Sequence, residues 1–331
     1  MKILLITDLY PVKEDEKTTP RTLWNFVQEW KKSGHQVDVI KPNFILNSFL
    51  RRKPFYKTGQ YGEVYNVNFW LPFVRKIKPP GTYDAIIAHM PSGILYADKL
   101  GLPFVAGIHN SDLQVLTKYP YFKTRMLNAL RNARAIACRS PVIKDKLLKL
   151  YPDFKNKTFV APSGVKIPPL PNVGEGRGEG AIKVLTVANN KKRKNIDKVI
   201  KACKGLEGFD FTVIRGGVDN EKVLETMRNS DIFILPSVNE TFGMVYLEAM
   251  ASGCITICTK NDGIDGIIKD NENGFTVEPT VQAIRRLLVK IKDTNPETLA
   301  TIRQNSLETV KDYTSAKCAE NYLHNIMFLL R

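Results

Sequence analysis

The sequence predicts an α/β protein made of two domains, each with a parallel β-sheet covered by helices. Three observations indicate this fold class. Short apolar runs typical of buried strands alternate with segments of helical periodicity. Residues 166–180 contain three prolines and four glycines, which is the composition of a linker. The chain has 331 residues, which is enough to bury two hydrophobic cores.

The N-terminal domain is expected over residues 1–165, and it opens with a strand, a helix and a second strand. Residues 2–7 form the first apolar run. Pro20 suits the first position of the helix that follows, because proline has no amide hydrogen to lose there. The second strand is expected at 36–40. Such a short strand–helix–strand unit implies that the two strands are parallel.

Two further strands of this domain are expected to end in histidines. The apolar runs 83–89 and 103–109 finish at His89 and His109. Ligands of an open parallel sheet bind at the carboxyl ends of its strands, so both side chains should face the binding site. A lone histidine is more often structural, and this reading is favoured for His89.

The C-terminal domain is expected over residues 181–315. It opens with a strand at 182–188, a polar loop and a helix at 194–202. Residues 316–331 carry apolar side chains on one stripe, which predicts an amphipathic helix that crosses back to pack on the N-terminal domain.

The most informative stretch of the chain lies between residues 231 and 253. Residues 232–235 are typical of a buried parallel strand, and 243–252 have helical periodicity with a glycine at the C-cap. A loop that runs into a helix N-terminus presents free amide hydrogens and the positive end of the helix dipole, which suits a diphosphate. Glu240 and Glu248 flank this anion site. Because carboxylates repel phosphates, their expected partners are the hydroxyls of a sugar or a ribose.

The pattern Pro-Ser-x-x-Glu-x-Phe-Gly-x-x-x-x-Glu-Ala-Met-Ala-x-Gly, which starts at Pro236, resembles the signature of the retaining GT-B glycosyltransferases of family 4. The segment from His109 to Asp112 resembles the His-x-x-Asp turn of the same family. This resemblance implies two Rossmann-like domains that face each other across a central cleft. The second domain would bind a nucleoside-diphosphate sugar as donor substrate, and the first would bind the acceptor.

The resemblance also implies a role for individual residues. Glu240, Lys194 and His109 are expected to be catalytic, and Asp112 and His89 lie on the acceptor side. The donor-binding residues are expected in the motif and in the loops after two strands: Glu248, Phe242, Gly243, Met244, Val245, Asn189, Arg193 and Gly217.

The chain departs from the family pattern at two places. Lys17 and Thr18 stand where the family has two glycines, which let the backbone approach the donor phosphates closely. Asn189 stands where the family has an arginine that grips the diphosphate. The positive charge of this clamp would then come from Lys194 and from neighbouring cations such as Arg193.

The composition describes a globular protein with an uneven charge. The net charge is +16, and residues 1–165 hold 26 basic and 12 acidic residues. Residues 41–80 combine eight basic residues, among them Arg51, Arg52 and Lys53, with nine aromatic residues. This combination predicts either an ordinary solvated face or a contact surface for an anionic membrane.

The same composition argues for a cytoplasmic protein at the inner face of the cytoplasmic membrane. No apolar run is long enough to span a bilayer, and the charged N-terminus does not resemble a signal peptide. The five cysteines are scattered and are expected to be buried free thiols. No Asp-x-Asp occurs in the chain, so neither a metal nor another cofactor is expected.

The predicted function is therefore metal-independent, retaining transfer of a sugar to a saccharide or lipid-linked acceptor, in the synthesis of a surface polysaccharide such as a lipopolysaccharide, or of a glycolipid. A catalytically silent protein that only binds nucleotide-sugars is the alternative. A basic nucleic-acid-binding protein would explain the charge but not the two glutamates. A dinucleotide oxidoreductase is disfavoured, because residues 8–20 contain no glycine.

Overall fold

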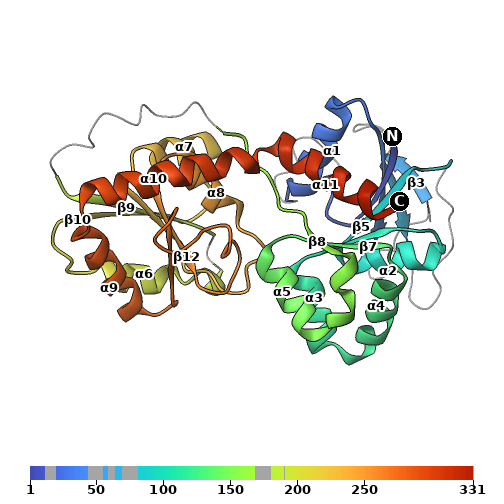
Figure 1. Ribbon diagram of the computed structural model, residues 1–331, viewed down its shortest axis with the longest axis horizontal. Helices are drawn as coiled ribbons and strands as arrows, with labels where there is room; N and C mark the ends of the chain where they lie inside the picture. The colour runs from blue at the N-terminus through green and yellow to red at the C-terminus, as the bar shows by residue number, and fades with distance from the viewer. Residues whose placement is uncertain are drawn as a thin grey trace. The chain divides into compact units, whose positions relative to one another are not determined.

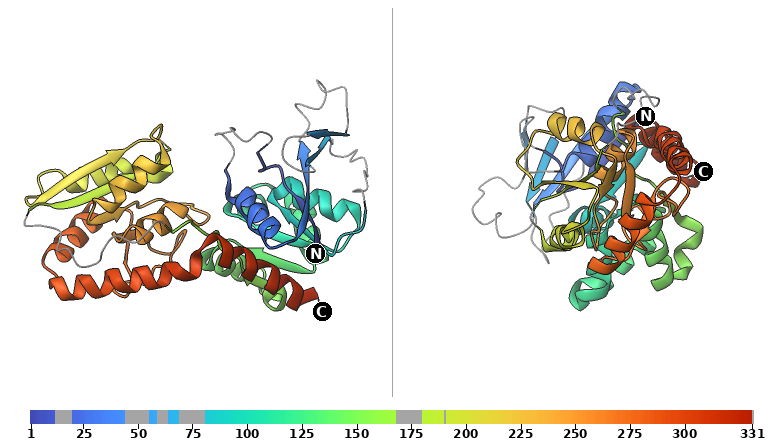
Figure 2. Two further views of the ribbon diagram at one scale, coloured as in Figure 1. Left: turned by 90° about the horizontal axis from the view of Figure 1, so that it is seen from above. Right: turned by 90° about the vertical axis from the view of Figure 1, so that its left-hand side faces the viewer.

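The computed structural model describes residues 1–11, 20–43, 55–58, 64–68, 81–167, 180–189 and 191–330. The chain forms two compact units. Unit 1 consists of Met1–Arg139, Ile143–Ser163 and Ser315–Arg331, and unit 2 consists of Ser140–Val142 and Gly164–Thr314. Each unit has its own sheet and its own helices (Figures 1 and 2). The prediction of two Rossmann-like α/β domains is confirmed.

The sheet of unit 1 has the strand order β3-β4-β2-β1-β5-β6-β7-β8, and every pair is parallel except the edge pair of β3 and β4. Strands β1 and β5 are the centre, with Ile3 opposite Ala85. The strands are β1 Lys2–Ile6, β2 Gln36–Asn43, β3 Phe55–Thr58, β4 Val64–Asn68, β5 Ala85–His89, β6 Val105–Ile108, β7 Ala135–Cys138 and β8 Thr158–Val160.

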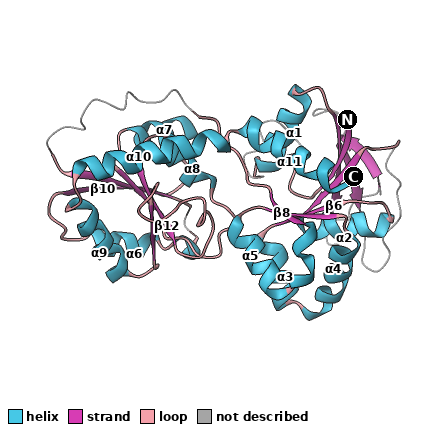
Figure 3. Ribbon diagram, in the orientation of Figure 1, coloured by secondary structure: helices cyan, strands magenta, loops and turns pink. Residues whose placement is uncertain are grey.

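Helices cover both faces of this sheet (Figure 3). Leu4 and Ile6 of β1 belong to one core cluster with the helices α2 to α5. Alternate residues of a strand point to opposite faces, so Ile3 and Leu5 face the other side, where α1 and α11 pack (Figure 1). The helices are α1 Thr22–Lys32, α2 Met90–Leu100, α3 Asn110–Lys118, α4 Pro120–Asn132, α5 Pro141–Leu150, the 3₁₀ helix η2 Pro152–Lys157 and α11 Ser315–Leu330.

The first helix starts later than the sequence predicted. Pro20 lies before α1, whose N-cap is Arg21. The backbone of Arg21 has φ −82° and ψ 4°, which is outside the helical range, so the helical turns begin only at Thr22.

Helix α11, at the end of the chain, belongs to unit 1. The indole Nε1 of Trp30 in α1 donates a hydrogen bond to the carbonyl of Ala319, at 2.9 Å. Tyr322 is 1% exposed and packs its ring against Phe26 and Trp30. Met327, which the sequence placed on the buried stripe, is 41% exposed. Viewed along the helix axis, Met327 is rotated by about 80° from Ala319, so it lies at the margin of the buried stripe.

Unit 2 has a parallel five-stranded sheet among its described residues, in the order β10-β9-β11-β12-β13. Its strands are β9 Ile182–Val187, β10 Phe209–Ile214, β11 Ile232–Ile234, β12 Ile255–Thr259 and β13 Phe275–Val277. Its helices are α6 Ile196–Cys203, α7 Asn220–Arg228, α8 Met244–Ala251, α9 Val281–Lys292 and α10 Pro296–Val310, with the 3₁₀ helices η3 Lys192–Lys194 and η4 Lys311–Tyr313.

The sheet of unit 2 separates two hydrophobic clusters. Phe233 packs on the side of α7, α8 and α10, while its neighbours Ile232 and Ile234 pack on the side of α6 and α9 (Figure 1). A strand that is apolar on both faces is expected in a parallel sheet with helices on both sides. The buried strand and the helix predicted between residues 231 and 253 are therefore both present. The helix was predicted at 243–252, and α8 begins one residue later and ends one residue earlier.

One boundary in unit 2 differs from the prediction and affects the site. The helix predicted at 194–202 is α6, which begins only at Ile196. Asn195 adopts a left-handed conformation with φ +53°, which interrupts the helical turns. Lys194 therefore lies in the short 3₁₀ turn η3 before the helix. Among the residues that the structure describes, no helix is long and apolar enough to cross a membrane.

Candidate active site

In unit 2, the loop between β11 and α8 is shaped by a glycine and a tyrosine. Gly243 has φ +93°, and a Cβ atom there would lie 2.4 Å from the ring of Tyr246. The hydroxyl of Tyr246 donates a hydrogen bond to the carbonyl of Leu235 at the end of β11, at 2.6 Å. The sequence Phe-Gly therefore allows the chain to turn tightly into the N-terminus of α8.

Asp262, which is not among the predicted site residues, fixes the part of this loop that carries Glu240. Its carboxylate accepts hydrogen bonds from the backbone amides of Asn239, Glu240 and Gly263. Asp262 follows β12 in the sequence Asn-Asp-Gly, and an aspartate in such a turn often binds nearby amides. That turn was the available signal, but it does not reveal that the bound amides lie 22 and 23 residues earlier.

Glu240 forms an ion cluster with two cations from η3. Its Oε2 accepts a hydrogen bond from Nη1 of Arg193 at 2.8 Å and another from Nζ of Lys194. Burial raises the pKa of the Glu240 carboxyl, but the two cations outweigh burial and hold this pKa below its ordinary value. Burial lowers the pKa of Lys194 in spite of its pairing with Glu240. We call Arg193, Lys194 and Glu240 the ion cluster.

Glu248, the second predicted carboxylate, has a different environment. It lies in the second turn of α8 and is half-buried, and its carboxylate has no hydrogen bond or ion pair with any residue that the structure describes. Burial raises the pKa of its carboxyl, and no cation opposes that effect.

The other predicted donor-binding residues lie around the same edge of the sheet. Phe242 is 4% exposed and belongs to the hydrophobic core, so only its backbone can reach a ligand. Met244 and Val245, in the first turn of α8, are half-buried against that core. Asn189, after β9, is exposed and lies beside Gly216, while Gly217 has φ +72° in the loop after β10.

In unit 1, the two predicted histidines are in contact. His89 ends β5, and His109 follows β6 as the N-cap of α3. Nδ1 of His89 lies 3.0 Å from Nε2 of His109, and Nε2 of His89 lies 2.9 Å from the hydroxyl of Tyr322. Burial, together with the charge of Arg139, lowers the pKa of both rings, to about 3 for His109. Both imidazoles are therefore neutral at pH 7.

Asp112 lies beside this pair. Its Oδ2 accepts a hydrogen bond from the backbone amide of His109, at 2.6 Å. Its Oδ1 is buried without a hydrogen-bond partner among the described residues. Burial raises the pKa of this carboxyl to about 8, and nearby Asp8 also raises it.

Arg139 and Ser163, which no motif in the sequence predicted as site residues, complete the carboxyl edge of this sheet. Arg139 follows β7, is 1% exposed, and donates to the hydroxyl of Ser163. Its guanidinium lies over the ring of Phe26, 4.9 Å from the centroid. The available signal was a charged residue directly after an apolar strand.

Some predictions fall outside the described residues. These are the departure at Lys17 and Thr18, the membrane-contact residues Arg51, Arg52 and Lys53, and most of the segments 41–80 and 166–180. All five cysteines lie among the described residues, and their thiols are free and buried, as the sequence predicted.

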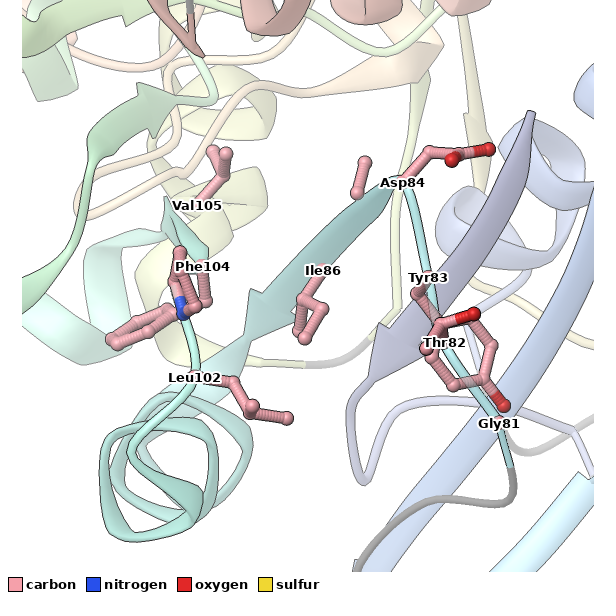
Figure 4. Close-up of a pocket in the computed structure, with 10 residues that line it drawn as sticks. Gly81, Thr82, Tyr83, Asp84, Ile86, Leu102, Phe104 and Val105 are labelled. Carbon is pink, nitrogen blue, oxygen red and sulfur yellow. The ribbon is translucent and has the colours of Figure 1, made fainter.

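A separate hollow of about 290 Å³ lies at the opposite edge of the sheet in unit 1. Figure 4 shows Tyr83, Ile86, Leu102 and Phe104 around it, at the amino ends of β5 and β6. Because the histidines lie at the carboxyl ends of the same strands, this hollow is not part of the candidate site.

Two family models match the chain. The model for glycosyl transferases group 1 matches residues 210–309, and the model for glycosyltransferase family 4 matches residues 19–167. An uncharacterized glycosyltransferase of Methanocaldococcus jannaschii, MJ1178, is 26% identical over 68% of each chain. A putative teichuronic acid biosynthesis glycosyltransferase of Bacillus subtilis, TuaC, is 23% identical over 88% of this chain and 89% of its own.

A third relative and two solved structures are similar along most of the chain. The alpha-monoglucosyldiacylglycerol synthase of Acholeplasma laidlawii is 22% identical over 69% of this chain and 70% of its own. A sucrose-phosphate synthase from Thermosynechococcus elongatus has a TM-score of 0.70 at 16% identity and full coverage of both chains. A trehalose-phosphate synthase from Burkholderia xenovorans has a TM-score of 0.71 at 8% identity, covering 99% of each chain. The chain thus has the GT-B fold and belongs to the group 1 glycosyltransferases.

Proposed function

We propose that this glycosyltransferase moves a hexosyl group from a nucleoside-diphosphate sugar to a saccharide or lipid-linked acceptor, with retention of configuration and without a metal ion. The observation that carries this proposal is the ion cluster, which holds two cations against one carboxylate directly before the N-terminus of α8. The net positive charge of the cluster and the dipole of the helix both favour a diphosphate.

The ion cluster can supply the charge stabilisation that sugar transfer requires. When the bond between the anomeric carbon and the phosphate oxygen breaks, negative charge develops on the leaving diphosphate. Arg193, Lys194 and the Gly243–Met244 amides would stabilise this charge in a preorganised site. This arrangement, together with the absence of an Asp-x-Asp sequence from the chain, supports transfer without a bridging metal.

The position of Arg193 also favours an enzyme over a silent binding protein. The sequence has Asn189 where the family has its phosphate-gripping arginine. Arg193 reaches the same oxygen of Glu240 as Lys194, so a guanidinium is available beside the lysine. We infer that Arg193 takes over the role of the missing arginine.

The carboxylates would recognise hydroxyls. We assign Glu240 to hydroxyls of the donor sugar and Glu248, which has no charged partner, to the ribose. The acceptor hydroxyl would attack the anomeric carbon on the face that the diphosphate leaves. A leaving phosphate oxygen would take the proton of that hydroxyl, so the charges balance without a separate protein base.

The transfer reaction can be tested with a panel of nucleotide-sugars and saccharide or lipid acceptors. We expect release of the nucleoside diphosphate, undiminished by a metal chelator, and a product with the anomeric configuration of the donor by NMR. Glu240→Gln keeps the shape of the side chain but loses a charged acceptor, so the rate should fall about tenfold to a hundredfold.

The matched control for Glu240→Gln is Glu225→Gln, which removes an exposed carboxylate on α7. It should leave the rate unchanged. Full activity of a folded Glu240→Gln variant would remove this residue from the site, and an inverted product would refute retention. A wild-type protein that binds nucleotide-sugars but neither transfers nor hydrolyses them would be the silent homologue.

We further propose that the protein works at an anionic membrane surface. The junction of α3 and α4 exposes Tyr119 and Tyr121, at 54% and 66%, next to the exposed Lys118 and Lys123. Residues 113–144 contain seven basic residues and no acidic residue. Aromatic side chains suit the headgroup region, and lysines attract anionic lipids. The diacylglycerol named for one relative is consistent with a lipid acceptor.

Sedimentation with vesicles tests this second proposal. The protein should sediment with anionic but not zwitterionic vesicles, and added salt should weaken binding, since it screens charges beyond about 8–10 Å. Exchanging Tyr119 and Tyr121 for serine, or Arg51, Arg52 and Lys53 for glutamate, should release the protein without affecting nucleotide binding. Absence of sedimentation at low salt would refute the proposal, and salt-sensitive retention on DNA would favour a nucleic-acid partner.

A further inference from the structure

Met90, the first residue of α2, has a strained backbone. Its φ is +67°, in the left-handed region, where the Cβ atom of a side chain crowds the following carbonyl. The other non-glycine residues with a positive φ in the described part of the chain are all asparagines, which tolerate this region. A glycine would adopt the same conformation without strain, so the side chain of Met90 is present in spite of the strain that it causes.

The turn at Met90 has a structural reason. Strand β5 ends at His89 and helix α2 begins at Met90, so no loop residue separates them. Helix α2 then lies directly against the end of β1, because a Cβ atom on Gly93 would be 2.4 Å from the carbonyl oxygen of Ile6. The chain must therefore turn within one residue. This requirement explains the backbone conformation but not the choice of methionine.

Core packing does not explain the side chain of Met90 either. Met90 is half-buried, and it is not part of the core cluster that α2 and α3 form with the sheet. Its sulfur atom lies 3.9 Å from the hydroxyl oxygen of Ser111, in the first turn of α3. The side chain therefore spans the starts of the two helices, at the carboxyl edge of the sheet.

The polar groups next to Met90 are buried or already bonded. His89 and Asp112 are 0% exposed. The side chain of His109 accepts a hydrogen bond from the backbone amide of Asp112, and its Nε2 lies 3.0 Å from Nδ1 of His89. Met90 and Ser111 are half-buried, so a ligand at this edge reaches their side chains first.

We propose that Met90 is a specificity-determining residue of the acceptor site, where its thioether packs against the apolar C–H face of a sugar ring. A methionine side chain is flexible and polarizable, so it can follow the uneven surface of such a ring. Strained residues gather at ligand sites, where the strain serves the function. This inference rests on the proposed sugar transfer for its purpose, whereas the strain can be measured without any substrate.

The strain is tested by thermal unfolding of Met90→Gly and Met90→Ala. Both variants lose the thioether, but only glycine relieves the positive φ. At an ordinary helical position, glycine is less stable than alanine. At position 90 the order should be reversed, with a Tm of Met90→Gly about 2 °C or more above that of Met90→Ala.

The matched control uses Met327, which is 41% exposed on α11 and has no positive φ. Met327→Gly should unfold at a lower temperature than Met327→Ala. Both Met327 variants should transfer sugar like the wild type, because this residue lies outside the site.

The sugar contact is tested by ¹³C NMR of the full-length protein labelled at the methionine methyl groups. The chain has seven methionines, so single Met→Leu variants can assign the signals. The probes are the methyl α- and β-glycosides of glucose, galactose and mannose, added to the protein one at a time. At least one probe should shift the signal of Met90, and none should shift that of Met327.

Steady-state kinetics measures the effect on transfer, with the most active acceptor of the transfer panel. In Met90→Gly and Met90→Ala, the KM for the acceptor should rise about three- to tenfold, as expected for the loss of an apolar contact. The KM for the nucleotide-sugar should stay the same. A role of Met90 in stability alone would not separate these two constants.

Three results would overturn the proposal: a Tm of Met90→Gly below that of Met90→Ala, a wild-type Met90 signal that no glycoside shifts, or an unchanged KM for the acceptor in the folded variants. The NMR result decides even if neither variant folds. A wild-type protein whose Met90 signal shifts but which transfers no sugar would instead refute the proposed function.

Discussion

The carboxyl edges of the two sheets differ in how their carboxyl groups are held. In unit 2 this edge carries the ion cluster, in which three ionisable side chains are 12–35% exposed and a carboxylate stays charged between two cations. In unit 1 the edge carries one buried cation, Arg139, beside two histidines, held neutral, and Asp112, whose burial favours the protonated acid. Both edges follow the same parallel topology, so the fold alone does not determine this difference.

The difference indicates what each edge can bind. Partly exposed cations can exchange their partner for an incoming anion at a lower desolvation cost than fully buried charges, which are expensive to maintain. Unit 2 is therefore suited to a diphosphate. Neutral buried donors and acceptors in fixed positions recognise uncharged hydroxyls, because a mismatch leaves a polar group unpaired. Unit 1 is therefore suited to a sugar.

The largest effect is expected from Lys194→Ala. If the cations of unit 2 hold the diphosphate, this variant should bind a nucleoside diphosphate about tenfold to a hundredfold more weakly, since hydrogen bonds to charged groups contribute roughly 1.5–3 kcal/mol. Binding of the free nucleoside should be unchanged. Calorimetry with both ligands measures the two affinities.

The control for this variant is Lys201→Ala, which removes an exposed cation of α6. It should bind both ligands like the wild type. If Lys194→Ala weakens the nucleoside and the diphosphate equally, Lys194 supports the loop through Glu240 and does not contact phosphate.

The elements of the fold could be predicted because their signals are local. The strand and helix around the Glu240 motif follow from apolar runs and from Gly243. The partners at the sites could not be predicted in the same way. Asp262 follows β12 and reaches amides in the loop after the neighbouring strand β11, and Tyr322 reaches His89 from the other end of the chain. Neither contact has a periodicity or a spacing that a sequence reveals.

The start of α6 is another feature that the sequence did not predict correctly. Asn195 tolerates the left-handed conformation that ends η3, and asparagine does so more readily than most residues. The helical pattern of the following apolar residues extends over this position and hides the break. The consequence is functional, because the break leaves Lys194 in a turn, from which it contacts Glu240.

An effect of intermediate size is expected from Asp112→Asn, which should change how the stability of the protein depends on pH. The pKa of Asp112 is raised to about 8 in the folded chain, against 3.8 for an ordinary aspartate. Between these values the folded state binds more protons than the unfolded state, so stability should fall as the pH rises from about 4 to about 8. Asparagine cannot ionise. The loss of Tm between pH 5 and pH 8 should therefore be smaller in the variant, by several degrees.

Thermal unfolding at several pH values measures this difference, and Asp98→Asn, on the surface of α2, is the control. A wild type and an Asp112→Asn variant with parallel Tm profiles would contradict a protonated Asp112. They would also remove the contrast between a protonated carboxyl in unit 1 and an ionised carboxylate in unit 2.

The smallest effect is expected from Glu248→Gln, which separates the two carboxylates of unit 2. Glu240 is tied to two cations, while Glu248 has no charged partner among the described residues, so the change should cost little stability. If Glu248 accepts hydrogen bonds from the ribose, the variant should bind a ribonucleoside diphosphate a few-fold more weakly, about 1 kcal/mol. Its affinity for the 2′,3′-dideoxy analogue should equal that of the wild type, because that analogue offers no ribose hydroxyl to lose. Calorimetry with the two nucleotides on both proteins provides the four affinities. Equal losses for both nucleotides would show that Glu248 shapes α8 and does not recognise a hydroxyl, which would leave Glu240 as the one carboxylate of the motif with a role in the donor site.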